Sequence, residues 1–169
     1  MTPCLFVFGT LRDADVLATV LGRADGVRTE PAALPGHAAL AVAGRDYPVL
    51  APDPDAEAPG ALVHGLDDAD RARLAWFEGE AYALAPCRVE TDAGTVDAVL
   101  FAAAAPLPTG GPWRLEDWRR DAKAAFLARA RRWMAEYGAA SPVADGVVWG
   151  PGPGNDAPTS GPGGGRRDG

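Results

Sequence analysis

The sequence predicts an α+β fold with a largely antiparallel or mixed sheet, and three observations lead to this class. Short apolar runs typical of strands alternate with helical segments in an irregular order, which fits neither a regular βαβ repeat nor an all-β chain. A hairpin pattern occupies residues 82–103. Near the end of the chain, residues 114–137 repeat apolar side chains at steps of three or four, as an amphipathic helix does.

The chain opens with a predicted buried strand followed by a short helix. Residues 4–8 form the apolar run of the strand. Asp13 is a favourable N-cap for a helix over about 14–21, and Gly22 is suited to end that helix because glycine accepts left-handed backbone angles.

The middle of the chain predicts several strands. Residues 34–43 are small and apolar but interrupted by Gly and His, which indicates a bent strand. A turn at 44–46 leads to a partner strand at 47–51. The acidic, proline-rich segment 52–59 is expected to be a loop, and residues 60–66 form a further strand.

A second helix and a hairpin follow. The acidic residues of 67–70 suit the first turn of a helix, where the backbone dipole favours negative charge. Leu74 and Phe77 give this helix a buried stripe. Residues 82–91 and 95–103 are the predicted strands of the hairpin, joined by a turn at Asp92-Ala93-Gly94.

We expect three regions along the chain. Residues 1–105 form the main domain, and residues 106–137 form a stiff linker and a C-terminal helix that packs on it. Residues 138–169 are rich in Gly and Pro and predict a disordered tail, because they offer too little apolar area to offset the entropy of ordering. The apolar stripe of the C-terminal helix consists of Leu115, Trp118, Ala122, Phe126, Ala130, Trp133 and Tyr137.

Composition excludes several classes of function. A net charge of −7 is unfavourable for binding nucleic acid or anionic membranes. No signal peptide or membrane-spanning apolar run is evident, so we expect a cytoplasmic protein. The abundance of Ala, Gly and Pro is typical of a GC-rich genome, and we expect a bacterial source. The two cysteines, Cys4 and Cys87, form no C-x-x-C pair.

The turn after the first strand is the first candidate site. The apolar run ends at Gly9, and Thr10 and Leu11 follow before the next helix begins. Backbone N–H groups at such a turn have no partner in strand or helix, so they can bind a carboxylate or a developing oxyanion. Arg12 is either a surface cation paired with a nearby Asp or a guide for an anionic substrate.

Glu78 is the second candidate. It follows two aromatic residues and precedes Gly79, near the end of a helix where a carboxylate is unfavourable. Burial beside aromatic rings raises the pKa of a carboxyl toward neutrality, which suits a group that takes and returns a proton. The neighbouring Glu80 is expected to face solvent.

Other chemistries find less support. The serines, Ser141 and Ser160, both lie late in the chain, so no Ser-His-Asp triad is expected. His37 and His64 lack a second ligand at helical spacing, and we expect no metal. Cys87 remains an alternative nucleophile.

Four segments resemble a known family. LFVFGTLRD, from residue 5 to 13, resembles the Y-G-T-L-R motif of the γ-glutamylcyclotransferase-like proteins, in particular the AIG2-like branch. Residues 47–50, 60–63 and 73–82 resemble later landmarks of that branch, in the same order, so that the resemblance covers roughly residues 4 to 103. The family usually has Tyr where this chain has Phe8, so one hydroxyl is absent.

The resemblance implies a small mixed or antiparallel β-barrel with flanking helices and a pocket at its mouth. It implies a cyclotransferase that releases 5-oxoproline and a free amine or amino acid from a γ-glutamyl amide or peptide, without a cofactor, in a monomer or homodimer. Glu78 would be the acid/base. The substrate-binding residues would be Phe8, Gly9, Thr10, Leu11, Arg12, Tyr47 and Tyr82. The alternative is a non-catalytic module that binds a small carboxylate or γ-glutamyl group, or a partner domain of another enzyme.

Overall fold

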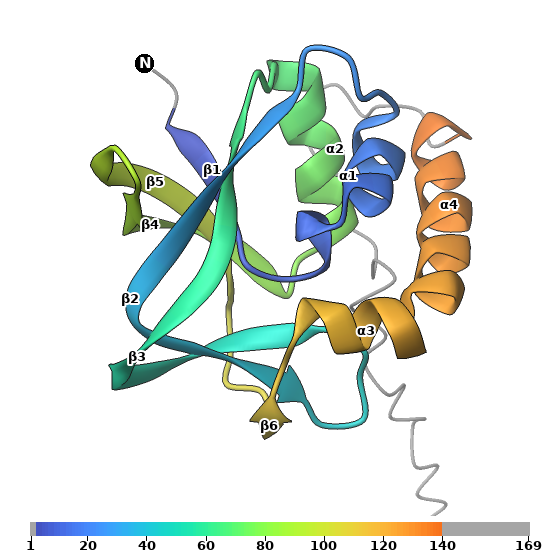
Figure 1. The fold of residues 1–169 in the computed structure, drawn as a ribbon. Helices are drawn as coiled ribbons and strands as arrows, with labels where there is room; N and C mark the ends of the chain where they lie inside the picture. Colours follow the sequence, from blue (N-terminus) through green and yellow to red (C-terminus); the bar gives the residue numbers. More distant parts are fainter. Residues whose placement is uncertain (1–2, 140–169) are drawn as a thin grey trace, which may run out of the picture.

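The computed structural model describes residues 3–139, which form a small β-barrel with helices packed against one side (Figure 1). The strands are β1 (Cys4–Val7), β2 (Arg28–Val42), β3 (Pro48–His64), β4 (Tyr82–Thr91), β5 (Gly94–Ala103) and β6 (Thr109–Pro112). The helical segments are η1 (Thr10–Arg12), α1 (Ala14–Leu21), α2 (Asp68–Glu78), α3 (Leu115–Asp121) and α4 (Lys123–Ala139). No helix within residues 3–139 is long and apolar enough to cross a membrane.

The barrel closes around the short first strand. β1 pairs antiparallel with β3 and parallel with β5. The sheet continues from β5 through β4 to β2, and β2 pairs with β3 to complete a ring of five strands, while β6 extends the sheet beyond β2. The ladder between β2 and β4 is a single residue pair, Ala33 with Glu90, so the closure is partial. The expected α+β class with a mixed barrel is confirmed.

The long hairpin of β2 and β3 differs from the sequence-based expectation. Residues 52–59 are not a loop but the middle of β3, and β2 begins six residues earlier than expected, at Arg28 rather than position 34. The register shifts between Pro35 and His37 of β2, where one residue opposes four residues of β3. Proline has no backbone N–H to donate to a neighbouring strand, so it is tolerated where the ladder is interrupted.

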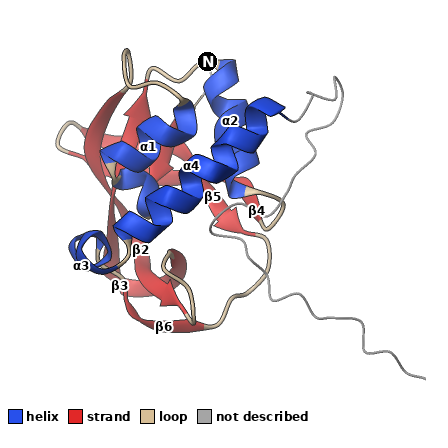
Figure 2. Cartoon of the chain, turned by 90° about the vertical axis from the view of Figure 1, so that its right-hand side faces the viewer, coloured by secondary structure: helices blue, strands red, loops and turns tan. Residues whose placement is uncertain are grey.

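Two helices follow the sequence closely. The Asp13 carboxylate caps α1 by accepting hydrogen bonds from the backbone N–H groups of Asp15 and Val16, and Gly22 ends the helix at φ 70°. Asp67 caps α2 through a capping box with Asp70. Figure 2 shows α1, α2 and α4 over one side of the sheet, and their contacts with one another make this a single layer.

The C-terminal segment contains two corrections. The single helix expected over 114–137 is broken at Ala122, whose φ of −128° lies outside the helical range, into α3 and α4. The apolar side chains keep their spacing of three or four residues across the bend. The periodicity of the sequence therefore does not indicate the break. The expected linker contains β6, which pairs with β2. The expected tail lies outside the described residues, except that positions 138 and 139 belong to α4.

Two apolar clusters hold these layers together. Successive β1 side chains point to opposite faces of the sheet, as strand geometry requires. Leu5 and Val7 face the helices and share a cluster with Trp118 and Phe126, whereas Phe6 packs inside the barrel. The end of β1 therefore lies where both clusters meet, and the candidate site is located there.

Candidate active site

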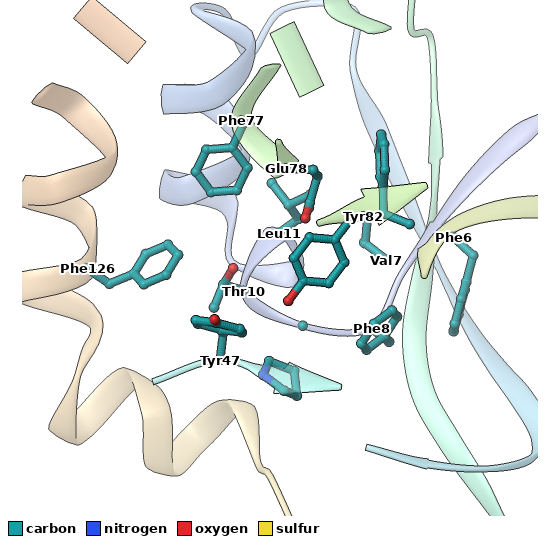
Figure 3. A pocket seen from close by; sticks show the side chains of 13 residues that line it. Phe6, Val7, Phe8, Thr10, Leu11, Tyr47, Phe77, Glu78, Tyr82 and Phe126 are labelled. Carbon is teal, nitrogen blue, oxygen red and sulfur yellow. The ribbon is translucent and has the colours of Figure 1, made fainter. Parts of the chain in front are cut away.

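A small pocket lies at the end of β1, where the barrel meets the helices (Figure 3). Its cavity volume is about 60 Å³, several times the 10–15 Å³ that one water needs, which suits a small molecule rather than a macromolecule. Glu78 is the only acidic or basic side chain among its lining residues. These are Phe6, Val7, Phe8, Gly9, Thr10, Leu11, Tyr47, Pro48, Phe77, Glu78, Tyr82, Phe101 and Phe126.

The turn from β1 into η1 forms one wall. Arg12 and Asp13 donate backbone hydrogen bonds to the carbonyls of Gly9 and Thr10, which fixes the turn. Gly9 has a negative φ of −120°, so it is not required for a left-handed backbone. It is required for space, because a Cβ there would lie 3.0 Å from the Pro48 Cγ atom.

Glu78 forms the facing wall. It is the last residue of α2, and Gly79 turns the chain away at φ 72°. In Figure 3 the Glu78 carboxyl and the Thr10 hydroxyl point toward the same space. Part of the Glu78 surface is open to the pocket, but the surroundings are mainly apolar. Burial raises the pKa of Glu78 from 4.5 to about 8, because it disfavours the charged carboxylate.

Two tyrosines complete the polar part of the pocket. Tyr47 ends the turn between β2 and β3, and Tyr82 is the first residue of β4. Burial raises the pKa of the Tyr82 hydroxyl, and the nearby Tyr47 and Glu78 raise it further, while the Arg45 cation opposes the shift. Tyr82 also forms a side-chain hydrogen bond with Tyr47. The two hydroxyls therefore lie together in the pocket, and that of Tyr82 stays protonated at neutral pH.

The C-terminal helices contribute to the same pocket. Phe126 of α4 is part of the lining and packs edge-on against Phe77 at a ring-centre distance of 6.4 Å. Arg129 of α4 forms an ion pair with Asp46, directly before Tyr47. The wall that carries Tyr47 is thus attached to α4.

The structure brings most of the predicted site residues together. Phe8, Gly9, Thr10, Leu11, Tyr47, Glu78 and Tyr82 all line the pocket. Arg12 does not. It is half-buried, and burial lowers the pKa of its guanidinium while the Glu116 carboxylate of α3 raises it. Glu80 is exposed, as expected. Cys87 lies outside the pocket, and burial raises the pKa of its thiol, which is unfavourable for a nucleophile.

Several residues that line the pocket were not predicted from the sequence. Each is apolar and lies within a strand or helix, so its sequence context is that of an ordinary core residue. Phe101 and Phe126 come from elements that are far from Glu78 in the sequence, so only the fold brings them to the site. The missed residues are Phe6, Val7, Pro48, Phe77, Phe101 and Phe126.

Comparison with known proteins agrees with this geometry. A family model described as gamma-glutamyl cyclotransferase, AIG2-like, matches residues 5–120. The chain belongs to this family. AIG2-like protein B of Arabidopsis thaliana is 26% identical over 120 residues, covering 69% of each chain. AIG2-like protein A of the same plant is 25% identical over 134 residues, covering 77% of this chain and 80% of the relative.

Solved structures share the fold of this AIG2-like chain. A solution structure of an Arabidopsis thaliana protein has a TM-score of 0.57 at 24% identity, covering 80% of this chain and 92% of that one. A structure described as a gamma-glutamyl cyclotransferase has a TM-score of 0.56 at 10% identity, covering 84% and 83%. At these identities the likeness supports the barrel and its helices, and no more.

Among residues 3–139 no group of three or more His, Cys, Asp or Glu side chains is arranged to hold a metal ion.

Proposed function

We propose that this chain is a γ-glutamylcyclotransferase that releases 5-oxoproline and a free amine or amino acid from a γ-glutamyl amide or peptide. The observation that carries the proposal is the position of Glu78, whose pKa is raised to about 8 in the same small pocket as the turn at residues 9–11. Membership of the family supports a γ-glutamyl compound as the small-molecule substrate.

The first step is a proton transfer from the substrate to Glu78. The α-ammonium group of the substrate lies against the carboxylate, and this cation offsets the unfavourable burial of a negative charge. An α-amino group has a reference pKa of about 7.7–8.0. Burial raises the pKa of Glu78 to about 8, close to that of the α-amino group, so Glu78 is suited both to take the proton and to return it.

The second step is ring closure. The uncharged amine attacks the γ-carbonyl carbon of the same molecule, and the new C–N bond gives a five-membered ring with a tetrahedral oxyanion. Both reacting groups belong to one substrate, so the protein needs only to fix their orientation. Backbone N–H groups of Thr10 and Leu11, at the start of η1, donate hydrogen bonds to the oxyanion.

The third step releases the products. The oxyanion collapses, the original amide C–N bond breaks, and Glu78 returns its proton to the departing amine. The apolar lining formed by Phe8, Phe77, Phe101 and Phe126 strengthens these polar interactions because it lowers the local dielectric constant. The hydroxyls of Tyr47 and Tyr82 hold the substrate's polar groups.

The test is a panel of γ-glutamyl compounds incubated with the full chain. It includes γ-glutamyl dipeptides, γ-glutamyl alkylamides and γ-glutamyl-ε-lysine, and mass spectrometry follows 5-oxoproline and the released amine together. Formation of both in equal amounts supports the proposal. Binding of a γ-glutamyl compound in calorimetry, with no 5-oxoproline from any compound, would instead support the binding-module alternative.

A further inference from the structure

A second set of reactive side chains lies at the other end of β1. The Cys4 Sγ atom is 3.6 Å from His64 Nδ1, and His64 Nε2 is 2.9 Å from Glu30 Oε2. The three residues come from neighbouring strands, with Cys4 in β1, His64 in β3 and Glu30 in β2. All three are half-buried, so part of each residue is exposed to solvent.

One tautomer of His64 suits both of its contacts. An ionised carboxylate can only accept, so the His64 Nε2 atom carries the hydrogen that it donates to Glu30. In a neutral imidazole the other nitrogen then has a lone pair, and the His64 Nδ1 atom accepts the proton of the Cys4 thiol. A thiol, a base and a group that orients the base are therefore in line, as in nucleophilic cysteine sites.

This cluster is separate from the pocket that contains Glu78. None of its three residues lines that pocket. Cys4 is the first residue of β1 and Phe8 follows its last, so the two lie about 13 Å apart at 3.3 Å per residue. In Figure 1 the chain enters β1, the strand that begins with Cys4, close to the N label. The proposed cyclisation therefore makes no use of the cluster.

Two arginines lie near Cys4. Arg28 lies opposite His64 in the β2–β3 ladder. Arg71 of α2 donates a hydrogen bond to the carbonyl of Pro3, next to Cys4, at 3.3 Å. From β5 the neighbour is the apolar Ala98. Glu30, the nearby negative charge, is paired with His64.

Cys4 cannot form a disulfide with Cys87 in this fold. Ala98 of β5 pairs with Cys4 on one side and with Cys87 on the other. The two cysteines are thus two strands apart, or about 10 Å, whereas a disulfide requires Cα atoms within about 7 Å. Any partner of the Cys4 sulfur must come from outside the chain.

We propose that Cys4 is a reactive thiol that exchanges with small disulfides, with His64 as its base and Glu30 as the residue that positions His64. His64 takes the thiol proton, and the Cys4 thiolate attacks one sulfur of the disulfide R–S–S–R. The S–S bond of the reagent breaks, a Cys4–S–S–R bond forms, and the leaving thiolate takes the proton from His64. The product is a mixed disulfide on β1, and one free thiol is released.

The test compares the two cysteines in the full chain. Cys87→Ser leaves only Cys4, and Cys4→Ser leaves only Cys87 as the matched control. The probe is 2,2′-dithiodipyridine, whose released thione is followed by absorbance, and intact mass confirms one adduct per chain. At pH 7 we expect Cys4 to react at least tenfold faster than Cys87. Equal rates, or a faster Cys87, would overturn the proposal.

The role of His64 is tested in the Cys87→Ser background. His64→Gln should slow Cys4 at least tenfold at pH 7, and should move the midpoint of its pH–rate profile up toward about 8.5, the value of an ordinary thiol. Glu30→Gln should give a smaller loss with a shift in the same direction. An unchanged rate and profile in folded His64→Gln, as judged by circular dichroism, contradicts the role of the base.

A further measurement covers the case in which His64→Gln does not fold. The pH midpoint of Cys4 is then measured in the folded Cys87→Ser protein and in the same protein in guanidinium. A lower midpoint in the folded protein supports activation by its surroundings, and an equal or higher midpoint refutes it. Neither result depends on whether γ-glutamyl compounds are turned over.

Discussion

Glu78 carries the proton in the proposed reaction, so its replacement is the sharpest test at the scale of a residue. Glu78→Gln keeps size and polarity but removes the acid/base group, and turnover should fall by about 10²–10⁴-fold. The matched control is Glu80→Gln, which changes an exposed carboxyl two positions away and should leave turnover nearly unchanged. Steady-state kinetics with any compound that yields 5-oxoproline measures the turnover of both variants. Full activity in Glu78→Gln would remove Glu78 from the mechanism.

The raised pKa of Glu78 also predicts a dependence of stability on pH. The folded protein holds this proton up to about pH 8, whereas the unfolded chain releases it near pH 4.5. Since the folded state binds more protons in this window, the contribution of Glu78 to stability is complete below about pH 4.5 and is lost as pH rises through about 8. Relative to Glu78→Gln, the wild type should lose at most about 1.4 kcal/mol per pH unit between these limits.

Denaturant unfolding of both proteins at several pH values measures this difference. Other titrating groups cancel because the two chains share them. The difference should level off above about pH 8. A flat difference from pH 5 to 8 would show that the Glu78 carboxyl is ionised in the folded protein.

Gly9 is a residue whose role is spatial. A methyl group on Gly9 would press on the Pro48 ring, which lines the pocket. We therefore expect Gly9→Ala to weaken binding of a γ-glutamyl compound more than it lowers the melting temperature. Gly111→Ala is the control, because a Cβ at Gly111 meets no atom within 4 Å. If calorimetry gives equal affinity for both variants and the wild type, the turn at residues 9–11 does not contact the ligand.

At the residue scale, the sequence predicted the polar half of the pocket better than the apolar half. Glu78 stands out because its position beside aromatic residues and before a glycine is unusual for a charged group. Phe126 carries no such mark, since its spacing fits a helix packed on a core. Arg12 is a candidate because it follows the turn and belongs to the segment that resembles the family motif, but its side chain lies near Glu116 of α3 instead. Adjacency in sequence does not fix side-chain direction.

At the scale of elements, Asp13 joins three helices. Its carboxylate caps α1 and also accepts a hydrogen bond from Arg119 of α3, while Lys123 of α4 lies 3.0 Å away. Burial opposes ionisation of Asp13, but hydrogen bonds from Arg119 and Lys123 outweigh it, so the pKa of Asp13 is lowered. Its contribution to stability is therefore present above about pH 4 and lost as pH falls through the folded pKa.

Two substitutions separate these roles of Asp13. Asp13→Asn keeps a capping oxygen but removes the charge, and should cost about 1.5–3 kcal/mol. Asp13→Ala also removes the cap and should cost about 1 kcal/mol more. The control is Asp15→Asn, an exposed partner of Lys123, which should cost less than about 1 kcal/mol. Equal free energies of unfolding for Asp13→Asn and the wild type would mean that the ion pairs contribute nothing.

Local signals explain which elements the sequence could predict. α1 is marked at both ends, by Asp13 and Gly22, and its bounds agree with the structure. The break at Ala122 has no such mark, because alanine is the best helix former. The prolines of 52–59 predict a loop, because proline is rare within strands. Residue propensity alone cannot reveal that four residues of β3 face one residue of β2 across an irregular ladder.

At the scale of the whole molecule, the helix-facing core includes residues from both ends of the described chain. Leu5 and Val7 share one cluster with Leu115, Trp118 and Met134. We therefore propose that the expected domain 1–105 is not an independent folding unit. A chain cut after residue 105 should show no cooperative melt, because it lacks α3 and α4 and exposes that cluster.

A second truncation, after Val148, is the matched comparison. It keeps α4 and removes most of the Gly- and Pro-rich segment, so its melting temperature should stay within about one or two degrees of the full chain. Scanning calorimetry of both truncated chains tests the boundary. A cooperative melt of residues 1–105 would show that α3 and α4 are accessory.

The central position of β1 has a consequence for the synthesis of the protein. β1 needs β3 on one side and β5 on the other, and its helix-facing side chains are covered by α4, close to the end of the described chain. A ribosome adds roughly 5–20 residues per second, so on the order of 6–25 s separate the emergence of β1 from that of α4. During this interval β3 and β5 become available to pair with β1, but the cluster on its helix-facing side still lacks the residues of α4. The first strand to be made is therefore among the last to be fully covered during synthesis.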